Sequence, residues 1–386
     1  MKSKQKPNRL PQRIALVLQG GGALGAYQAG VYEALHEHDL CPDWIVGTSI
    51  GAINAAIIAG NHRDVRIARL REFWDTVSYD DMIEMDHVPD SARKFNTWVN
   101  TVNATTHGVP GFFTPRVMNP FAAGLPVTPE VASFYDTGPL QATLERLVDL
   151  DYLNAPGGIR LTVNAMAVTT GQLAGFDSRS HNLRIEHIMA SGALPPGFPP
   201  VRVDEELYWD GGLFSNTPLE TVLDDEPRLD TLCFMVDLWS AQGPEPTTFD
   251  EVQTRQKDVT FASRSKLHID DYLRLHEMRK AVRALYGRLP PELRTAAEQK
   301  ILADVGANTT MHIVRLAYAG RDWHMASKDI NFSRGSIRWR WQQGYRDATR
   351  AVENAAWMNM VPDDSGVVVH ELVPPGESFT QTHVKK

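Results

Sequence analysis

The sequence has few cysteines and no long apolar run. With only Cys41 and Cys233 among 386 residues, a disulfide framework is excluded, and a reducing compartment is indicated. No segment approaches the run of about 18 apolar residues that a membrane-spanning helix needs. The short apolar stretch 14–18 runs into glycines and does not have the form of a secretory signal. We therefore expect a cytoplasmic protein.

The chain has fewer positively charged than negatively charged residues. The 39 Lys and Arg residues are outnumbered by 47 Asp and Glu residues, which gives a formal net charge of −8. This balance argues against a nucleic-acid partner and gives no general attraction to anionic lipid. Residues 1–12 are the local exception, because they are basic without an acid, and we expect them to form a disordered tail. The alternative is a peripheral contact of this tail with the inner membrane face.

Motifs for metals and cofactors are also missing. The chain has no HExxH, no CxxC and no tight carboxylate cluster. We therefore predict neither a metal nor a cofactor. No internal repeat is visible.

One motif that is present is GxSxG, as Gly47-Thr48-Ser49-Ile50-Gly51. It lies between an apolar stretch at 44–46, which is typical of a buried strand, and a small-residue helix at 52–59. A turn of this kind lifts the serine hydroxyl out of the sheet edge, and glycines flank it because a Cβ there would collide with the bend. Ser49 is therefore the candidate nucleophile, and the alternative is a plain glycine-bounded turn.

A second motif follows the expected strand at 14–18. It consists of Gly20, Gly21, Gly22, Ala23 and Gly25, and an expected helix at 26–35 follows it. Successive glycines let amide N–H groups point to one place, and the helix start adds its positive dipole end, so the loop is suited to hold an oxyanion. The same glycines satisfy GxGxxG, but a dinucleotide site needs an acid at the end of the second strand. This chain has Gly47-Thr48-Ser49 there, which argues against a nicotinamide or flavin site.

The third motif is Asp210-Gly211-Gly212, preceded by an expected short strand at 206–209. A serine hydroxyl is a weak nucleophile until a base takes its proton, and a carboxylate within hydrogen-bond reach can be that base. Asp210 is the candidate, and the alternative is an Asp that only nucleates a turn. A triad with a histidine is the rival arrangement, and His324 is its best candidate.

In this order, the three motifs resemble the patatin-like family of lipid acyl hydrolases. A fourth match is the segment 190–200, which is similar to the serine- and proline-bearing block that precedes the DG turn in that family. The resemblance implies a Ser-Asp dyad with Ser49 as nucleophile and Asp210 as base. It also implies that backbone amides of the glycine loop, from Gly21 to Ala23, hold the oxyanion.

Two positions bear on the substrate. Many family members carry Arg or Lys where this chain has Leu24. A cation there could steady negative charge, so the substrate is left open among phospholipid, lysophospholipid and neutral lipid. Asn216, just past the Asp210 turn, is a candidate to orient a substrate carbonyl, and the alternative is that it caps the helix at Pro218.

Strands that alternate with amphipathic helices in the first sixty residues predict βαβ units and a parallel sheet. The fold class is therefore α/β, and the resemblance implies a three-layer α/β/α patatin-like fold with a mostly parallel central sheet. We place the catalytic domain at 13–240. Within it, 139–153 predicts one helix.

The composition changes after about residue 240 and becomes charged and helical. We assign 241–386 to a C-terminal helical extension with a returning strand at 311–318 and a helix at 336–357. The apolar stripe between Tyr272 and Tyr286 is expected to be a packing face, and a surface for a partner is the alternative.

Residues 78–137 show no clear periodicity and are rich in Pro, Gly, Asn and aromatics. A stretch that long inside a compact enzyme is usually functional or mobile. One hypothesis is a lid whose Phe112, Phe113, Phe121 and Leu125 shape an acyl-chain groove over the nucleophile. The alternative is a loop that uses these side chains to pin itself down.

The sequence therefore predicts a serine acyl hydrolase that cleaves carboxylic esters of lipids through an acyl-enzyme. Two alternatives stay open. The same Ser49 could serve an acyltransferase or a polyester depolymerase, which differ in the acceptor that clears the acyl-enzyme. From another class, the chain could be a lipid-binding protein without catalytic activity.

Overall fold

The structure is a computed structural model that describes residues 11–80, 90–116, 126–262, 264–293, 295–296, 309–318, 327–353 and 366–371. Most of the expected basic tail lies outside this part of the chain, as do Phe121, Leu125 and His324. None of the helices in the described ranges is long and apolar enough to cross a bilayer.

The strands form a large sheet and a small one. The large sheet contains β1 (Arg13–Leu18), β2 (Trp44–Gly47), β5 (Arg160–Ala167), β6 (Leu173–Asp177), β7 (Val201–Val203), β8 (Glu206–Asp210), β9 (Thr231–Asp237), β10 (Met311–Ala317) and β11 (Val367–Glu371). The small sheet pairs β3 (Thr114–Pro115) with β4 (Tyr135–Asp136).

The α-helices are α1 (Ala26–Glu37), α2 (Ile50–Ala59), α3 (Arg66–Thr76), α4 (Asp90–His107), α5 (Gly138–Leu147), α6 (Leu150–Asn154), α7 (Ile185–Ser191), α8 (Leu219–Leu223), α9 (Phe249–Phe261), α10 (Ser265–Arg288) and α12 (Arg334–Glu353). Short 3-10 helices are η1 (Gly22–Gly25), η3 (Pro129–Val131), η4 (Gly211–Leu213) and η5 (Pro291–Leu293).

The large sheet runs in the order β11-β10-β9-β1-β2-β5-β8-β7, and β6 also pairs with β5. The strands from β11 to β5 along this order are parallel to their neighbours, whereas β6, β7 and β8 pair antiparallel. In the middle of the sheet, Leu18 of β1 lies opposite Gly47 of β2 and Val236 of β9. Because parallel strands end at one edge, the loops that follow β1, β2 and β9 converge there.

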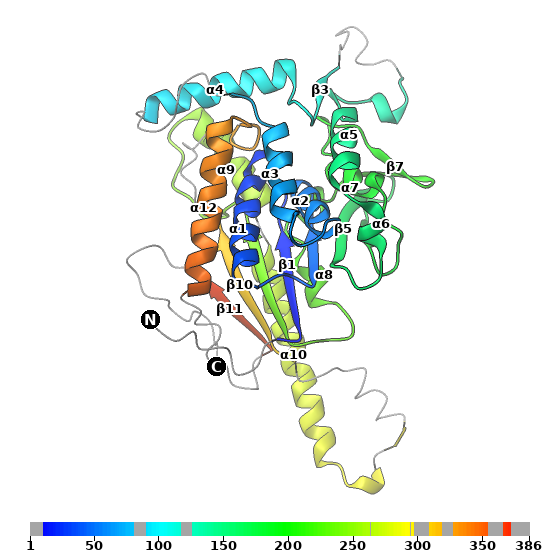
Figure 1. The fold of residues 1–386 in the computed structure, drawn as a ribbon. Helices are drawn as coiled ribbons and strands as arrows, with labels where there is room; N and C mark the ends of the chain where they lie inside the picture. The colour runs from blue at the N-terminus through cyan, green and yellow to red at the C-terminus, as the bar shows by residue number, and fades with distance from the viewer. Residues whose placement is uncertain are drawn as a thin grey trace.

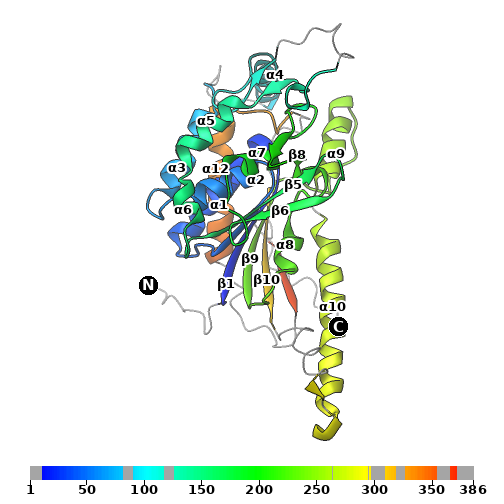
Figure 2. The same ribbon diagram turned by 90° about the vertical axis from the view of Figure 1, so that its right-hand side faces the viewer.

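Helices cover both faces of the sheet and give three layers. Figures 1 and 2 show α1, α2, α3 and α12 on one face and α8 and α10 on the other. The side chains of β1 alternate accordingly, as expected of a strand. Leu16 and Leu18 belong to the core beneath α1 and α2, whereas Ala15 and Val17 belong to a second core with Tyr272 of α10. The predicted α/β fold with a mostly parallel central sheet is confirmed.

The segment 78–137 contains a helix that its sequence did not reveal. The inward positions of α4 include Thr97, Asn100 and Ala104, which are at most 5% exposed. The large apolar residues Trp98 and Val102 are 55% and 41% exposed, so the apolar periodicity of the sequence does not mark the buried face of this helix. The amide of Asn331 donates to the Thr97 hydroxyl at 3.3 Å, which gives this face a polar partner.

The single helix expected at 139–153 is wrong, because the chain forms α5 and α6 there. Val148 and Asp149, which separate the two helices, have extended backbone. The Asp149 carboxylate accepts a hydrogen bond from the Tyr152 amide at 2.9 Å, and the Asp149 amide donates to the Gly60 carbonyl at 3.0 Å. This side-chain cap begins a new helix instead of continuing the first.

The C-terminal extension shares the sheet and the core of the preceding residues. The expected strand 311–318 is present as β10, which pairs with β9, and β11 was not predicted. Helix α12 lies along α1 (Figure 1). A Cβ on Gly30 would lie 1.9 Å from the Trp341 carbonyl oxygen, and one on Gly344 would lie 2.0 Å from the Tyr27 carbonyl oxygen. The two helices therefore pack backbone to backbone, and one core spans the boundary at residue 240.

Only the first half of α10 packs against the sheet. Ile269 and Tyr272 are buried, but the large apolar positions between Leu275 and Leu285 are 40% to 66% exposed. Figure 2 shows the end of α10 extending beyond the strands. The packing face expected for the whole stripe is therefore present only in its first part.

The contact between α1 and α12 can be tested with Gly344→Val. The new side chain would overlap the Tyr27 carbonyl, so we expect the melting temperature to fall by roughly 5 °C or more, as for a severe core clash. Gly287→Ala is the control, because nothing lies within 4 Å of its Cβ position. Equal melting temperatures for the two variants in a thermal scan would contradict the close packing.

Candidate active site

Ser49 occupies a sharp turn between β2 and α2. Its backbone has φ 57° and ψ −126°, a left-handed conformation that costs free energy in a residue other than glycine. A Cβ on Gly47 would lie 2.5 Å from the Gly51 carbonyl oxygen, and one on Gly51 would lie 2.3 Å from that of Leu18. Both flanking glycines are thus needed for the bend, as the sequence predicts for a nucleophile elbow.

The amide of Ser49 is fixed by Ser191, at the end of α7. It donates to the Ser191 carbonyl at 3.1 Å and to the Ser191 hydroxyl at 3.0 Å. The hydroxyl in turn donates to the Asn164 carbonyl of β5 at 2.7 Å. Ser191 lies in the serine- and proline-bearing block but received no role from the sequence. Its position shows that it holds the elbow.

Asp210 ends β8, in register with Ala165 of β5. Its side chain is buried, and one carboxylate oxygen accepts the Gly212 amide at 2.7 Å. The Ser49 hydroxyl lies near enough to the carboxylate to lower its pKa. The fold therefore brings the two predicted catalytic side chains, 161 positions apart in the sequence, close to each other.

Burial raises the pKa of Asp210 from 3.8 to about 7, because the ionised carboxylate loses its water. The hydrogen bond from Gly212 and the nearby Ser49 hydroxyl oppose this shift, since both stabilise the ionised form. A carboxyl group with this pKa can accept and return a proton near neutral pH.

The glycine loop lies beside Ser49. A Cβ on Gly20 would lie 3.0 Å from the Ser49 Cβ. Gly21, Gly22 and Ser49 are partly exposed, whereas Ala23 and Gly25 are buried. The loop and the nucleophile therefore face solvent together.

Some backbone amides of this loop already donate hydrogen bonds within the described part of the protein, and others do not. The Gly20 amide donates to the Asn216 carbonyl at 3.1 Å, and the Ala23 amide donates to the Asp329 carbonyl at 2.8 Å. The amides of Gly21 and Gly22 have no hydrogen-bond acceptor among the described residues. The expected oxyanion donors are thus reduced from three to two, because Ala23 is already used.

The side chain of Asn216 holds the glycine loop. Its side-chain nitrogen donates to the Gly20 carbonyl at 3.2 Å and to the Phe261 carbonyl at 2.8 Å. These bonds use both hydrogens of the side-chain amide nitrogen. A contact between Asn216 and a substrate carbonyl stays a prediction.

Phe112 and Phe113 are 7% and 5% exposed. Their ring centroids lie 6.0 and 5.3 Å from that of Phe198, and Phe113 also lies 4.7 Å from Tyr135. This packing favours the alternative in which the aromatics pin the loop down. A lid over the nucleophile stays a prediction.

No histidine within the described ranges forms a hydrogen bond with the side chain of Ser49 or Asp210. The hydrogen bond to the Asp210 side chain comes from the Gly212 amide. His312 and His370 instead contact each other at 3.1 Å, on β10 and β11. No group of three or more His, Cys, Asp or Glu side chains suited to a metal ion occurs in the part of the chain that the structure describes.

Two protein-family models together match most of the chain. The model of a family described as patatin-like phospholipase matches residues 16–223, more than half of the chain. A second model, described as patatin phospholipase, matches residues 259–364. The first match contains all three motifs, and the second covers much of the C-terminal extension.

Individual proteins are similar over shorter stretches. Triacylglycerol lipase 4 of Saccharomyces cerevisiae is 45% identical over 60 residues, which is 16% of this chain and 7% of the lipase. An uncharacterized NTE family protein of Mycobacterium tuberculosis is 26% identical over 213 residues, 55% of this chain and 28% of that protein. The chain thus spans less than a third of either relative.

Among solved structures, VipD from Legionella pneumophila is similar with a TM-score of 0.39 and 14% identity. The match covers 92% of this chain and 72% of VipD.

The burial of Asp210 predicts a pH-dependent effect of Asp210→Asn on stability. A carboxyl group whose pKa is raised by folding stabilises the folded state fully below its unfolded pKa and loses this as the pH rises to about 7. The neutral amide avoids that loss. We expect Asp210→Asn to raise the melting temperature at pH 8 by at least about 2 °C, with a smaller gain at pH 5.

Asp64→Asn, at an exposed carboxylate, is the control for this measurement and should give no gain that grows with pH. A melting temperature of Asp210→Asn that is lower than wild type at pH 8 would contradict the burial of an ionised carboxylate at Asp210.

Proposed function

This chain belongs to the patatin-like phospholipase family, and on that basis we propose that it hydrolyses carboxylic esters of lipids with Ser49 as nucleophile and Asp210 as general base. The observation that carries the proposal is the approach of the Ser49 hydroxyl to the buried Asp210 carboxyl group, whose pKa is about 7. A base poised near the working pH is what proton transfer from a serine requires.

In the first step, the Ser49 oxygen attacks the ester carbonyl carbon while its proton moves to Asp210. The carbonyl oxygen becomes an oxyanion and accepts hydrogen bonds from the amides of Gly21 and Gly22. When the carbon–oxygen bond to the alcohol breaks, the proton on Asp210 passes to the departing oxygen. An acyl-enzyme at Ser49 and a free alcohol result.

In the second step, water attacks the acyl-enzyme carbonyl and gives a proton to Asp210. The same two amides hold the second oxyanion. Its collapse breaks the bond to the Ser49 oxygen, which takes the proton back from Asp210. A fatty acid leaves, and the enzyme returns to its starting state.

The residue at position 24 of the glycine loop bears on which lipid esters are substrates. Leu24 is fully buried, so the position that carries a cation in many family members offers none here. The proposed oxyanion donors are backbone groups, and they do not depend on a phosphate in the substrate. We therefore include neutral lipid esters with phospholipids and lysophospholipids, in line with the similarity to a triacylglycerol lipase.

The alternatives predict different products. An acyltransferase or polyester depolymerase would form the same acyl-enzyme, but an acyltransferase would pass the acyl group to an alcohol acceptor other than water, and a depolymerase would prefer a polymeric ester. A lipid-binding protein without activity would form no acyl-enzyme at all. An assay of radiolabelled acyl products with and without an added alcohol separates these cases.

Covalent labelling tests the nucleophile directly. A fluorophosphonate probe should label the wild-type protein at Ser49, and Ser49→Ala should abolish the label. Asp210→Asn should slow labelling by at least about a hundredfold, because general-base catalysis typically contributes that much. Ser180→Ala, at an exposed serine, is the control and should be labelled like wild type. Label that persists in Ser49→Ala would remove the proposed nucleophile.

The pH dependence tests the base. Only ionised Asp210 can accept a proton, so kcat/KM for a soluble ester should rise with pH with a midpoint near the pKa of about 7. A kcat/KM that stays flat between about pH 5 and pH 9 would exclude a base with this pKa.

A further inference from the structure

The C-terminal extension reaches the glycine loop through Asp329. The Asp329 carbonyl accepts the Ala23 amide at 2.8 Å. Gly22 has φ +54°, and a Cβ there would lie 2.3 Å from the same carbonyl oxygen. Asp329 therefore packs its main chain directly against the loop, and only glycine fits at position 22.

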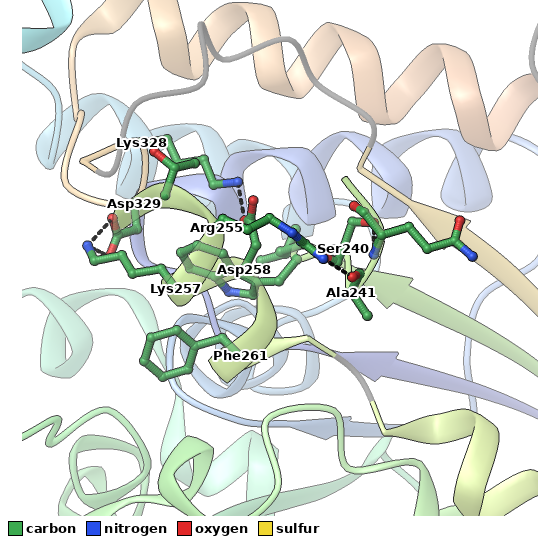
Figure 3. Close-up of polar contacts among 12 residues, drawn as sticks. Ser240, Ala241, Arg255, Lys257, Asp258, Phe261, Lys328 and Asp329 are labelled. Atoms are coloured by element: carbon green, nitrogen blue, oxygen red, sulfur yellow. Dashed lines mark hydrogen bonds and ion pairs between the residues drawn. The ribbon is translucent and has the colours of Figure 1, made fainter. Parts of the chain in front are cut away.

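Two crossed ion pairs join Asp329 and its neighbour to α9. Lys257 Nζ lies 2.9 and 3.1 Å from the two carboxylate oxygens of Asp329, and Lys328 Nζ lies 2.6 Å from Asp258 Oδ1. Each pair of adjacent residues thus presents one cation and one anion to the other pair (Figure 3). The four side chains are 15% to 34% exposed, so solvent screens these pairs less than pairs on the open surface.

Helix α12 holds the same segment from another side. Arg340 is fully buried, and its guanidinium donates to the Lys328 carbonyl at 2.8 Å and to the Asn331 carbonyl at 3.0 Å. The carbonyl of Asp329 lies between these two anchor points in the sequence. Its direction is therefore fixed by contacts on both sides.

The end of α9 is tied to the glycine loop as well. The Phe261 carbonyl accepts hydrogen bonds from Asn216 at 2.8 Å and from Gln19 at 3.1 Å. Trp239 Nε1 donates to the Gly20 carbonyl at 2.8 Å, and its ring centroid lies 5.4 Å from that of Phe261. Helix α9, the segment 328–331 and the loop therefore form one connected unit.

We propose that the pairs Lys257–Asp329 and Lys328–Asp258 are a positioning clamp, by which the C-terminal extension sets the direction of the Gly21 and Gly22 amides. The inference rests on the proposed function, because the clamp acts on the oxyanion donors of Ser49. By binding the Ala23 amide, the Asp329 carbonyl fixes the loop immediately after the two donors. Oxyanion stabilisation depends on donors that are oriented before reaction, so a loosened clamp lowers the rate of the chemical step.

Charge reversal and charge swap test the clamp. Lys257→Asp opposes like charges at Asp329, and we expect kcat to fall about tenfold with little change in KM, because donor geometry is impaired but not lost. The double variant Lys257→Asp/Asp329→Lys restores opposite charges and should recover most of kcat. Lys328→Asp and its swap with Asp258→Lys should behave in the same way.

A structural readout separates this inference from the proposed function. Hydrogen exchange in a peptide that contains residues 20–25 reports the Ala23 amide in the full chain, whether or not any ester is hydrolysed. We expect faster exchange in Lys257→Asp and Lys328→Asp and slower exchange again in the swapped variants. Arg274→Asp disrupts an exposed ion pair with Asp271 on α10 and should change neither exchange nor kcat.

Different results would contradict the proposed function and the positioning clamp. A wild-type protein that hydrolyses no ester and resists the probe would end the proposed function, and the exchange data would still report the clamp. Wild-type kcat and unchanged exchange of the loop in both charge reversals would overturn the clamp. Loss of kcat that the charge swaps do not recover, at unchanged exchange, would also overturn it.

Discussion

The candidate site depends on the approach of a serine in a strained turn to a carboxylate removed from water. Burial alone makes ionised Asp210 unfavourable, and the hydrogen bond from Gly212 and the nearby Ser49 hydroxyl offset only part of that cost. The surrounding sheet must supply the rest of the stability. Ser191 and β5 do so locally, because they fix the elbow amide and lie next to the strand that carries Asp210.

Sheet topology explains why distant motifs meet. β1 delivers the glycine loop, β2 delivers Ser49, and both end at the same edge of a parallel sheet. β8 runs antiparallel to β5 and brings Asp210 to that edge from a later part of the chain. β9 adds Trp239, whose indole holds the Gly20 carbonyl. Each strand therefore contributes a short polar segment to a site that no single segment could form.

The parts of the candidate site that could be predicted from the sequence are those whose geometry is set by neighbouring residues. Gly47 and Gly51 are required by the bend, and the prediction of Ser49 needs only the residues beside it. The use of the Ala23 amide by Asp329 could not be predicted, since it joins residues 306 positions apart and involves a backbone carbonyl that any residue has. Helix α4 was missed for a different reason, because Thr97 and Asn100 are buried whereas the large apolar side chain of Trp98 is exposed.

Because β10 pairs with β9, its place in the sheet determines whether the first 240 residues can be separated from the rest of the chain. β9 is paired on both sides, by β1 and by β10. A fragment that stopped after residue 240 would leave one side of β9 as an open edge, with its N–H and C=O groups ready to pair with another molecule. Such a fragment would also uncover the face of α1 that contacts α12 around Gly30. Because the far end of the chain completes the sheet, we expect a fragment of residues 1–240 to aggregate.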